Sequence, residues 1–158
     1  MGLDMYLYLS KYESCGSWQP GFEQKAVGFY PADLDKLSSD LLKRDFLSKE
    51  TYYQVGYWRK ANAIHKWFVD VCASGIDECQ KIYVPIERAK ELRNLCQRVL
   101  DNHELAEELL PTEEGFFFGS QKYDEWYFED LKYTKDLLEV VIKMANDFGY
   151  EIIYQASW

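Results

Sequence analysis

The 158-residue sequence has few of the residues that build metal and redox sites. It contains four cysteines and two histidines, and no two cysteines form a CxxC pair. A structural zinc site needs Cys and His ligands at short spacings, so we expect no metal ion. Cys72 and Cys96 fall on apolar faces of predicted helices, where a free cysteine acts as a small hydrophobic side chain. The sequence therefore predicts reduced thiols and no cofactor.

Long apolar runs are also missing. No segment approaches the roughly 20 apolar residues that a transmembrane helix needs. The first ten residues, MGLDMYLYLS, have no basic start and only a short apolar stretch, unlike a secretory signal peptide. Tyr6 occupies the position at which N-myristoylation requires Ser or Thr. We therefore expect a cytoplasmic protein without a membrane anchor.

The sequence lacks a surplus of basic residues. It has 18 Lys and Arg against 27 Asp and Glu, a net charge of −9. Residues 101–130 hold ten acidic residues and Lys122 as their one basic residue, so this segment accounts for the whole net charge. An acidic protein does not attract a phosphate backbone, and we expect no direct binding to nucleic acid. The segment is either a solvated surface, the commoner case, or an acidic surface that engages a basic protein.

Aromatic residues, by contrast, are abundant. The chain has 13 Tyr, 9 Phe and 5 Trp, which together make up 17% of its residues. Tyr and Trp combine large apolar rings with polar tips, and they are frequent in cores near the surface, at subunit interfaces and in stacking sites. The simplest interpretation is a Tyr-rich core and subunit interface. We expect a homodimer or a higher oligomer, with the symmetric dimer as the default.

The hydrophobic pattern predicts an α+β fold in a single domain over residues 1–158. Alternating apolar residues predict strands at 3–9 and 150–158, and residues 82–84 are β-prone. Apolar spacings of three and four predict helices at residues 32–44, 61–72, 86–99 and 123–147, with a short helical turn at 103–110. Residues 13–24 are predicted as a loop, and Phe116 to Phe118 as a β-prone triplet. Strands at both ends favour a small mixed or antiparallel sheet packed against about four helices.

Residues 51–72, TYYQVGYWRKANAIHKWFVDVC, change from a β-prone run into a helical pattern. At 100° per residue, one arc is apolar and predicted to be buried: Ala61, Ile64, Phe68, Val71 and Cys72. Beside this arc lie Trp58, Asn62 and His65, and Arg59 continues toward solvent. This gradient suits the rim of a concave site. It is also the ordinary boundary of a buried helix face, which is the more common case, because His and Trp are intermediate in burial.

A second segment rich in recognition-type side chains is LLPTEEGFFFGSQKYDEWYF, residues 109–128. It is not a phosphate-binding loop, since the GxxxxGK pattern is absent. Its backbone N–H groups could still meet an anion at the start of the following helix. We predict one ligand pocket from both segments, lined by Tyr57, Trp58, Arg59, Asn62, His65, Phe117, Ser120, Tyr123 and Trp126.

Three pieces of the chain, MGLDMYLYLSKY, VGYWRKANAIHKWF and LLPTEEGFFFGSQKYDEWYFEDL, together resemble a group of small proteins of tailed bacteriophages and prophages. The resemblance covers about a third of the chain. That group has no established activity, so it contributes no catalytic residue. The resemblance implies a viral protein that acts in the cytoplasm of a bacterial host. An accessory or host-interaction role, such as anti-defence, is then favoured over a metabolic one.

Three functions stay open. The first is binding of a small nucleotide-like ligand, with sequestration of a host signal as the use, because bases stack on aromatic rings and arginine pairs with phosphate. The second is an inhibitor or interaction module whose acidic 101–130 segment engages a basic host protein. The third is a small hydrolase-type enzyme that uses His65 or His103. GxSxG, HExxH and HxH patterns are all absent, so binding is favoured over catalysis and no catalytic residue is predicted.

Overall fold

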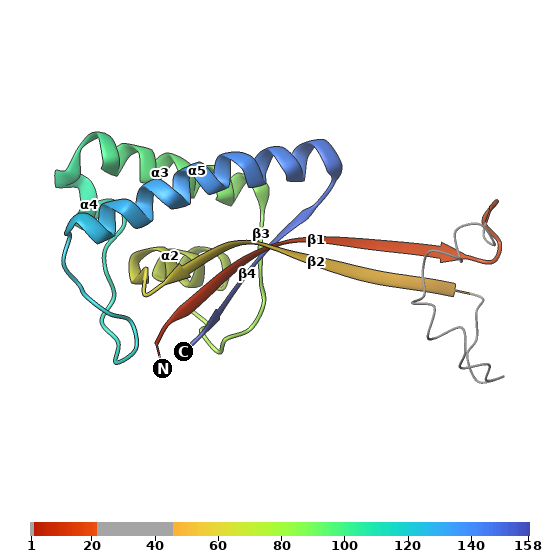
Figure 1. Ribbon diagram of the computed structural model, residues 1–158, viewed down its shortest axis with the longest axis horizontal. Coiled ribbons are helices and arrows are strands. Elements are labelled where there is room, and N and C mark those ends of the chain that lie inside the picture. The colour runs from red at the N-terminus through yellow and green to blue at the C-terminus, as the bar shows by residue number, and fades with distance from the viewer. Residues whose placement is uncertain (1, 22–45) are drawn as a thin grey trace. The chain divides into compact units, whose positions relative to one another are not determined.

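The structure is a computed structural model, in which residues 2–21 and 46–158 are described (Figure 1). The predicted helix 32–44 lies outside the described residues. The chain forms two compact units, one of residues 1–10 and 52–158 and the other of residues 11–51. The predicted single domain over residues 1–158 stays a prediction.

The first unit is built on an antiparallel sheet with the strand order β2-β1-β4-β3. Its strands are β1 (Asp4–Gly16), β2 (Phe46–Arg59), β3 (Ile82–Val84) and β4 (Glu151–Ser157). β1 and β4 are the central strands and pair antiparallel, from Asp4 opposite Ser157 to Ser10 opposite Glu151. β3 pairs with the other side of β4, with Ile82 opposite Tyr154. The α+β class and a sheet that contains both terminal strands are thus confirmed, and the sheet is antiparallel.

One face of the sheet forms the core. Leu3, Met5, Leu7 and Leu9 are at most 5% exposed, as their alternation predicts. In β4 the alternation is incomplete, because Ile153 is buried along with its neighbours Ile152 and Tyr154. Ile153 stands between Tyr8 of β1 and Tyr83 of β3, so neighbouring tyrosines flank it on the outer face. Trp158 lies beyond the end of β4 and is exposed.

The helices pack on the core face. Among the described residues they are α2 (Asn62–Cys72), α3 (Ile86–Asp101), α4 (Ala106–Leu109) and α5 (Glu125–Phe148), with a 3₁₀ turn at His103–Leu105. α3 and α5 lie side by side (Figure 1). The residues predicted to face inward from α3, Ala89, Leu92, Cys96 and Val99, are fully buried. Asp124 caps the first turn of α5, and Gly149 ends it in a left-handed conformation with φ of 69°.

Two predicted segments form other structures. Residues 13–16 belong to β1 and not to a loop, and within the second unit Glu13 pairs with Lys49 of β2 at 3.2 Å. The partner strand β2 is what allows β1 to continue there. Phe116 to Phe118 form a turn closed by the Phe118 N–H, which donates to the Gly115 carbonyl at 3.1 Å. A β-prone triplet needs a neighbouring strand along its length, and this triplet has one backbone bond to the residue before β1, from Leu3 N–H to the Phe117 carbonyl.

Candidate functional site

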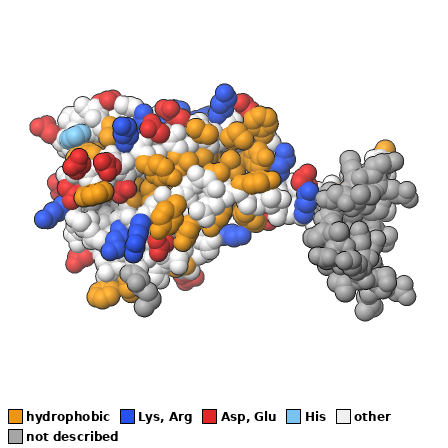
Figure 2. Space-filling view, viewed as in Figure 1, with side chains coloured by type: hydrophobic (Ala, Val, Ile, Leu, Met, Phe, Trp, Pro, Cys, Tyr) orange, Lys and Arg blue, Asp and Glu red, His pale blue; other side chains and the backbone are white. Residues whose placement is uncertain are grey.

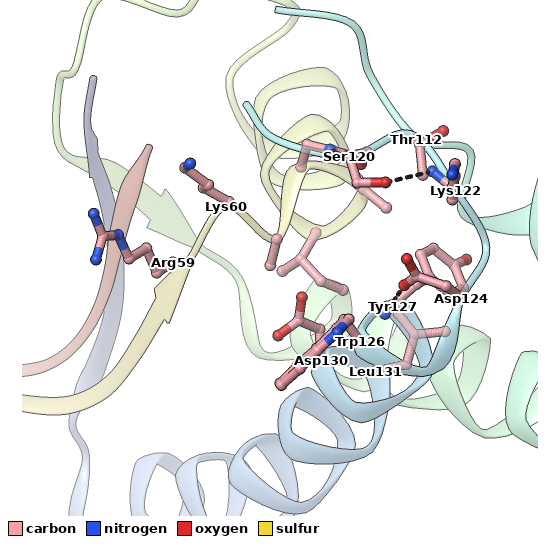
Figure 3. Close-up of a pocket in the computed structure, with 14 residues that line it drawn as sticks. Arg59, Lys60, Thr112, Ser120, Lys122, Asp124, Trp126, Tyr127, Asp130 and Leu131 are labelled. Atoms are coloured by element: carbon pink, nitrogen blue, oxygen red, sulfur yellow. Dashed lines mark hydrogen bonds between the residues drawn. The ribbon is translucent and has the colours of Figure 1, made fainter. Parts of the chain in front are cut away.

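A pocket of about 250 Å³ opens where the β2–α2 turn faces the 111–124 loop and the first turns of α5 (Figure 3). Its polar lining residues are Arg59, Lys60, Asn62, Thr112, Ser120, Lys122, Asp124 and Asp130. Its apolar lining residues are Ala61, Ala63, Ile64, Trp126, Tyr127 and Leu131. The pocket therefore joins the two sequence segments that were predicted to form one site.

The apolar part of the pocket belongs to the hydrophobic core. Ile64 and Leu131 are at most 1% exposed, and Tyr127 is 7% exposed. The Tyr127 hydroxyl donates to the Leu110 carbonyl at 2.8 Å, and its burial raises the pKa of that phenol well above its ordinary value. These side chains are fixed by packing, so the pocket has a rigid apolar floor that exists without a ligand.

Asn62 holds the 111–124 loop against the start of α2. Its amide nitrogen donates to the carbonyls of Phe118 at 3.0 Å and Ser120 at 2.8 Å. Its amide oxygen accepts from the Glu113 N–H at 3.1 Å. The side chain is 3% exposed, so both donors and the acceptor are used where water cannot replace them. Asn62 therefore positions both limbs of the loop that forms one wall of the pocket.

Lys60 adopts a backbone conformation that is rare outside glycine, with φ of 63°. Its N–H donates to the Leu3 carbonyl at 2.8 Å, and its carbonyl accepts from the Asn62 N–H at 2.9 Å. Its stem lies against Gly119, where an added Cβ would come within 3.0 Å of the Lys60 Cβ. Such conformations persist where surrounding contacts enforce them, and they gather at functional sites. Lys60 lines the pocket at this turn, and its side chain extends away from Asp130 and Trp126 (Figure 3).

Three cations surround the opening. Arg59 and Lys60 lie on one side, with their charged ends directed away from Asp130 and Trp126, and Lys122 lies with Thr112 and Ser120 on the other (Figure 3). All three cationic residues are exposed. In the part of the chain that the structure describes, none of them forms an ion pair with a carboxylate. The same lining holds two carboxyl groups, Asp124 and Asp130, so the charged residues of the pocket have a small positive balance in a protein with a net charge of −9.

The wall formed by α5 has a different character. Asp130 is half-buried, and burial raises the pKa of its carboxyl to about 6, with smaller contributions from the charges of Glu129 and Asp124. Trp126, one helical turn earlier, is 75% exposed beside the pocket. The pocket thus offers cations on its rim, an exposed indole, and a carboxyl group that exchanges its proton near neutral pH.

Four of the nine predicted site residues line this pocket: Arg59, Asn62, Ser120 and Trp126. Trp58 was assigned to the side of a helix and instead belongs to β2, where it is buried and donates from Nε1 to the Thr134 hydroxyl at 2.9 Å. Tyr57 contacts Asp4 through its hydroxyl. Tyr123 packs on Tyr127, and Phe117 lies in the turn at the tip of the loop.

His65, the fifth predicted residue outside the pocket, lies in a buried chain of polar groups. Its Nδ1 meets the Tyr154 hydroxyl at 2.8 Å and its Nε2 meets Asp77 at 3.0 Å. His65 and Tyr154 are both fully buried, and burial raises the pKa of the Tyr154 phenol well above its ordinary value. A phenol held in its protonated form is a poor nucleophile. The hydrogen bond between His65 and Tyr154 joins α2 to β4 inside the core. His103 stacks on Phe128 with ring centroids 3.7 Å apart.

Sequence reasoning missed several residues of the pocket, among them Lys60, Lys122 and Asp130. Asp130 follows Trp126 by four residues on the predicted helix, so the two share a face and Asp130 could have been found by that spacing. Lys60 and Lys122 adjoin predicted site residues, but a single surface lysine carries no signal in a sequence.

Among the described residues, no helix is long and apolar enough to cross a bilayer. No three His, Cys, Asp or Glu side chains of the described segments are grouped so that they could hold a metal ion. Comparison with known proteins found no matching family model, no matching curated protein and no matching solved structure.

Proposed function

We propose that the protein binds a small nucleotide-like anion in the pocket beside the first turns of α5. The observation that carries the proposal is the gathering of Arg59, Lys60 and Lys122, all unpaired among the described residues, around one apolar cavity of an acidic protein. Water solvates these unpaired cations, and a phosphate group can replace that water as their hydrogen-bond acceptor. The positive charges also repel one another. A bound anion would remove that repulsion.

The pocket suits the separate parts of a nucleotide. Arg59 can pair with a phosphate through two parallel N–H bonds, and the lysines supply flexible point charges. The exposed indole of Trp126 offers a face on which a base can stack, worth about 1–3 kcal/mol. The Asp130 and Asp124 carboxyls can accept hydrogen bonds from the amino groups of a base. The volume of about 250 Å³ lies near the lower end of small-molecule pockets.

The resemblance to phage and prophage proteins gives this binding a setting. A viral protein in the cytoplasm of a bacterial host would benefit from removing a nucleotide signal of the host defence. Neither histidine that was considered as a catalytic base lines the pocket. We therefore propose sequestration of the nucleotide, without turnover, as the function.

A panel of mononucleotides and cyclic nucleotides, measured by thermal shift and calorimetry, tests the proposal. We expect at least one of them to raise the melting temperature of the wild-type protein. Lys60→Ala and Lys122→Ala should each weaken its binding about tenfold, since a charge-assisted hydrogen bond contributes about 1.5 kcal/mol. Lys132→Ala, an exposed lysine of α5 outside the pocket, is the matched control and should bind as the wild type does. Absence of binding across the panel, or unchanged binding by the Lys60 and Lys122 variants, would refute the proposal.

The alternative, an acidic surface that engages a basic host protein, also has an observation in its favour. Glu104, Glu107 and Glu108 are exposed on the 3₁₀ turn and α4. No ion pair with a described residue neutralises them. Such a surface would speed association with a basic partner in a salt-sensitive manner. We favour the pocket, because its residues converge on a defined cavity.

A further inference from the structure

α5 carries a second row of apolar side chains beside the row that it buries in the core. We define this outer row as Tyr133, Leu137, Val140 and Met144, which follow one another at spacings of four, three and four. Tyr133 is 42% and Val140 62% exposed, and Leu137 and Met144 are half-buried. Figure 2 shows hydrophobic side chains gathered over the face of the molecule on which α5 lies. The buried row runs separately, through Tyr127, Leu131, Leu138, Val141 and Ala145.

The inner edge of the outer row is supported by β2, which fixes its geometry. Tyr133 packs edge-on against Trp58 with ring centroids 5.7 Å apart, and its hydroxyl accepts from the Tyr57 N–H at 3.3 Å. An added Cβ at Gly56 would come within 2.4 Å of Leu137, so the strand and the helix touch at that point. The row is therefore a rigid ridge that needs no rearrangement to meet a partner.

The spacing of the outer row specifies what fits against it. Apolar residues at alternating intervals of three and four are the positions that interlock with the side chains of another helix. Among soluble monomers, single exposed apolar residues are ordinary, whereas a continuous apolar ridge marks an interaction surface. The spacing of the outer row is therefore suited to packing against another helix.

The charges beside the outer row identify that helix. Asp136 and Lys143 lie seven residues apart along the same flank of the row, and Lys143 has no ion pair with a described residue. Asp136 contacts the adjacent Lys135 at 2.9 Å, with its side chain 55% exposed, so that pair contributes little to stability. A partner helix must present a cation opposite Asp136 and an anion opposite Lys143. α5 itself does so when it is turned around.

We propose that the outer row is the interface of a symmetric dimer in which α5 packs antiparallel to α5 of a second copy. In this pairing Leu137 meets Val140 of the second copy, and Tyr133 meets its Met144, which gives four apolar layers about the two-fold axis. Asp136 then lies about 3 Å along the helix axis from the level of Lys143 of the second copy, at 1.5 Å rise per residue. The two-fold axis forms this charge pair twice, and an isologous interface of this kind closes at two subunits.

Sedimentation and native mass spectrometry of the full chain test the dimer. We expect the wild-type protein to be dimeric, and Val140→Glu to weaken the dimer at least tenfold by placing a carboxylate in an apolar layer. Because Val140 is largely exposed in one chain, Val140→Glu should keep the wild-type circular dichroism spectrum. Lys132→Glu, on the same helix but outside the outer row, is the control that should leave the dimer intact.

Exchange of charges tests the orientation of the helices. Asp136→Lys alone places lysine opposite Lys143, and Lys143→Asp alone places aspartate opposite Asp136, so each variant should dimerise less well than the wild type. A mixture of the two variants should form a heterodimer, in which every flanking pair again has opposite charges. A wild-type protein that stays monomeric at about 100 µM overturns the proposal. A Val140→Glu protein that dimerises as the wild type does also overturns the proposal. A mixture of Asp136→Lys and Lys143→Asp that forms no heterodimer overturns the antiparallel pairing.

Discussion

Burial raises the pKa of the Asp130 carboxyl to about 6, from an ordinary value of 3.8. Between these two values the unfolded chain has released the proton while the folded protein keeps it. The folded protein then binds more protons than the unfolded chain, so its free energy of unfolding falls as the pH rises through this window. Above pH 6 the penalty is present in full, because the carboxylate is charged in a partly desolvated position next to Asp124 and Glu129.

Asp130→Asn should remove this penalty. We expect the variant to exceed the wild type by about 1 kcal/mol in free energy of unfolding at pH 8, a value that allows for partial solvent exposure. At pH 4 the two proteins should be equal, since the wild-type carboxyl is then protonated in the fold. Urea unfolding at both pH values measures the difference. Glu107→Gln, at an exposed position of α4, is the control, and an equal gain at pH 4 and pH 8 would contradict the assignment.

Asn62 shows what a sequence can and cannot say about one residue. Its place beside the apolar arc of residues 51–72 predicted a polar group at a boundary, and it does lie where the core meets the pocket. Its role as the residue that holds the 111–124 loop depends on carbonyls 56 and 58 positions further along the chain. No local pattern encodes such a contact. His65 is similar, because its partner Tyr154 lies 89 positions away.

At the scale of elements, α3 and α5 could be predicted almost to the residue. Each has an uninterrupted apolar stripe at helical spacing, and each has a punctuating residue, Pro85 before α3 and Gly149 after α5. The junction of β2 and α2 could not. Only Lys60 and Ala61 separate the strand from the helix. The helical projection was therefore continued back to Trp58, which belongs to the strand. The left-handed turn at Lys60 gives no signal, since glycine is absent there.

The contact between β2 and α5 rests on the absence of a side chain at Gly56. A Cβ there would come within 2.4 Å of a Leu137 methyl and 3.1 Å of the Leu7 Cβ. We expect Gly56→Ala to lower the free energy of unfolding by about 1–3 kcal/mol, the usual cost of overpacking a core. Chemical denaturation measures this loss.

Leu137→Ala in the Gly56→Ala background makes room for the added methyl. The double variant should therefore lose less than the sum of the two single losses, because the residues are in contact. Additive losses would mean that Leu137 does not restrain Gly56. Gly75→Ala provides a contrast: nothing lies within 4 Å of a Cβ there and its φ of 81° is left-handed, so any loss of stability in that variant comes from the backbone and not from packing.

At the scale of the whole molecule, the acidic residues of the 3₁₀ turn and α4 are separate from the lining of the pocket, whereas Asp124 and Asp130 of the same acidic segment line it. The acidic residues Glu104, Glu107 and Glu108 belong to the 3₁₀ turn and α4, and none of them lines the pocket. Surface charges act over a Debye length of about 8 Å at physiological salt, so their effect on a bound nucleotide is small under those conditions. The ligand-binding function and the acidic-surface function can therefore be separated by substitution.

The triple variant Glu104→Gln, Glu107→Gln, Glu108→Gln makes that separation. If the protein binds a nucleotide in the pocket, the dissociation constant of the variant at 0.15 M salt should stay within about twofold of the wild type, and it should fall slightly at low salt as repulsion is relieved. If the acidic surface carries the function, a basic partner bound by the wild type should be lost from the variant. Calorimetry with the nucleotide and a pulldown with host extract read the two outcomes from the same protein. A variant that binds the nucleotide much more tightly at 0.15 M salt would show that the charge of α4 reaches the pocket, and the two functions would then share one surface.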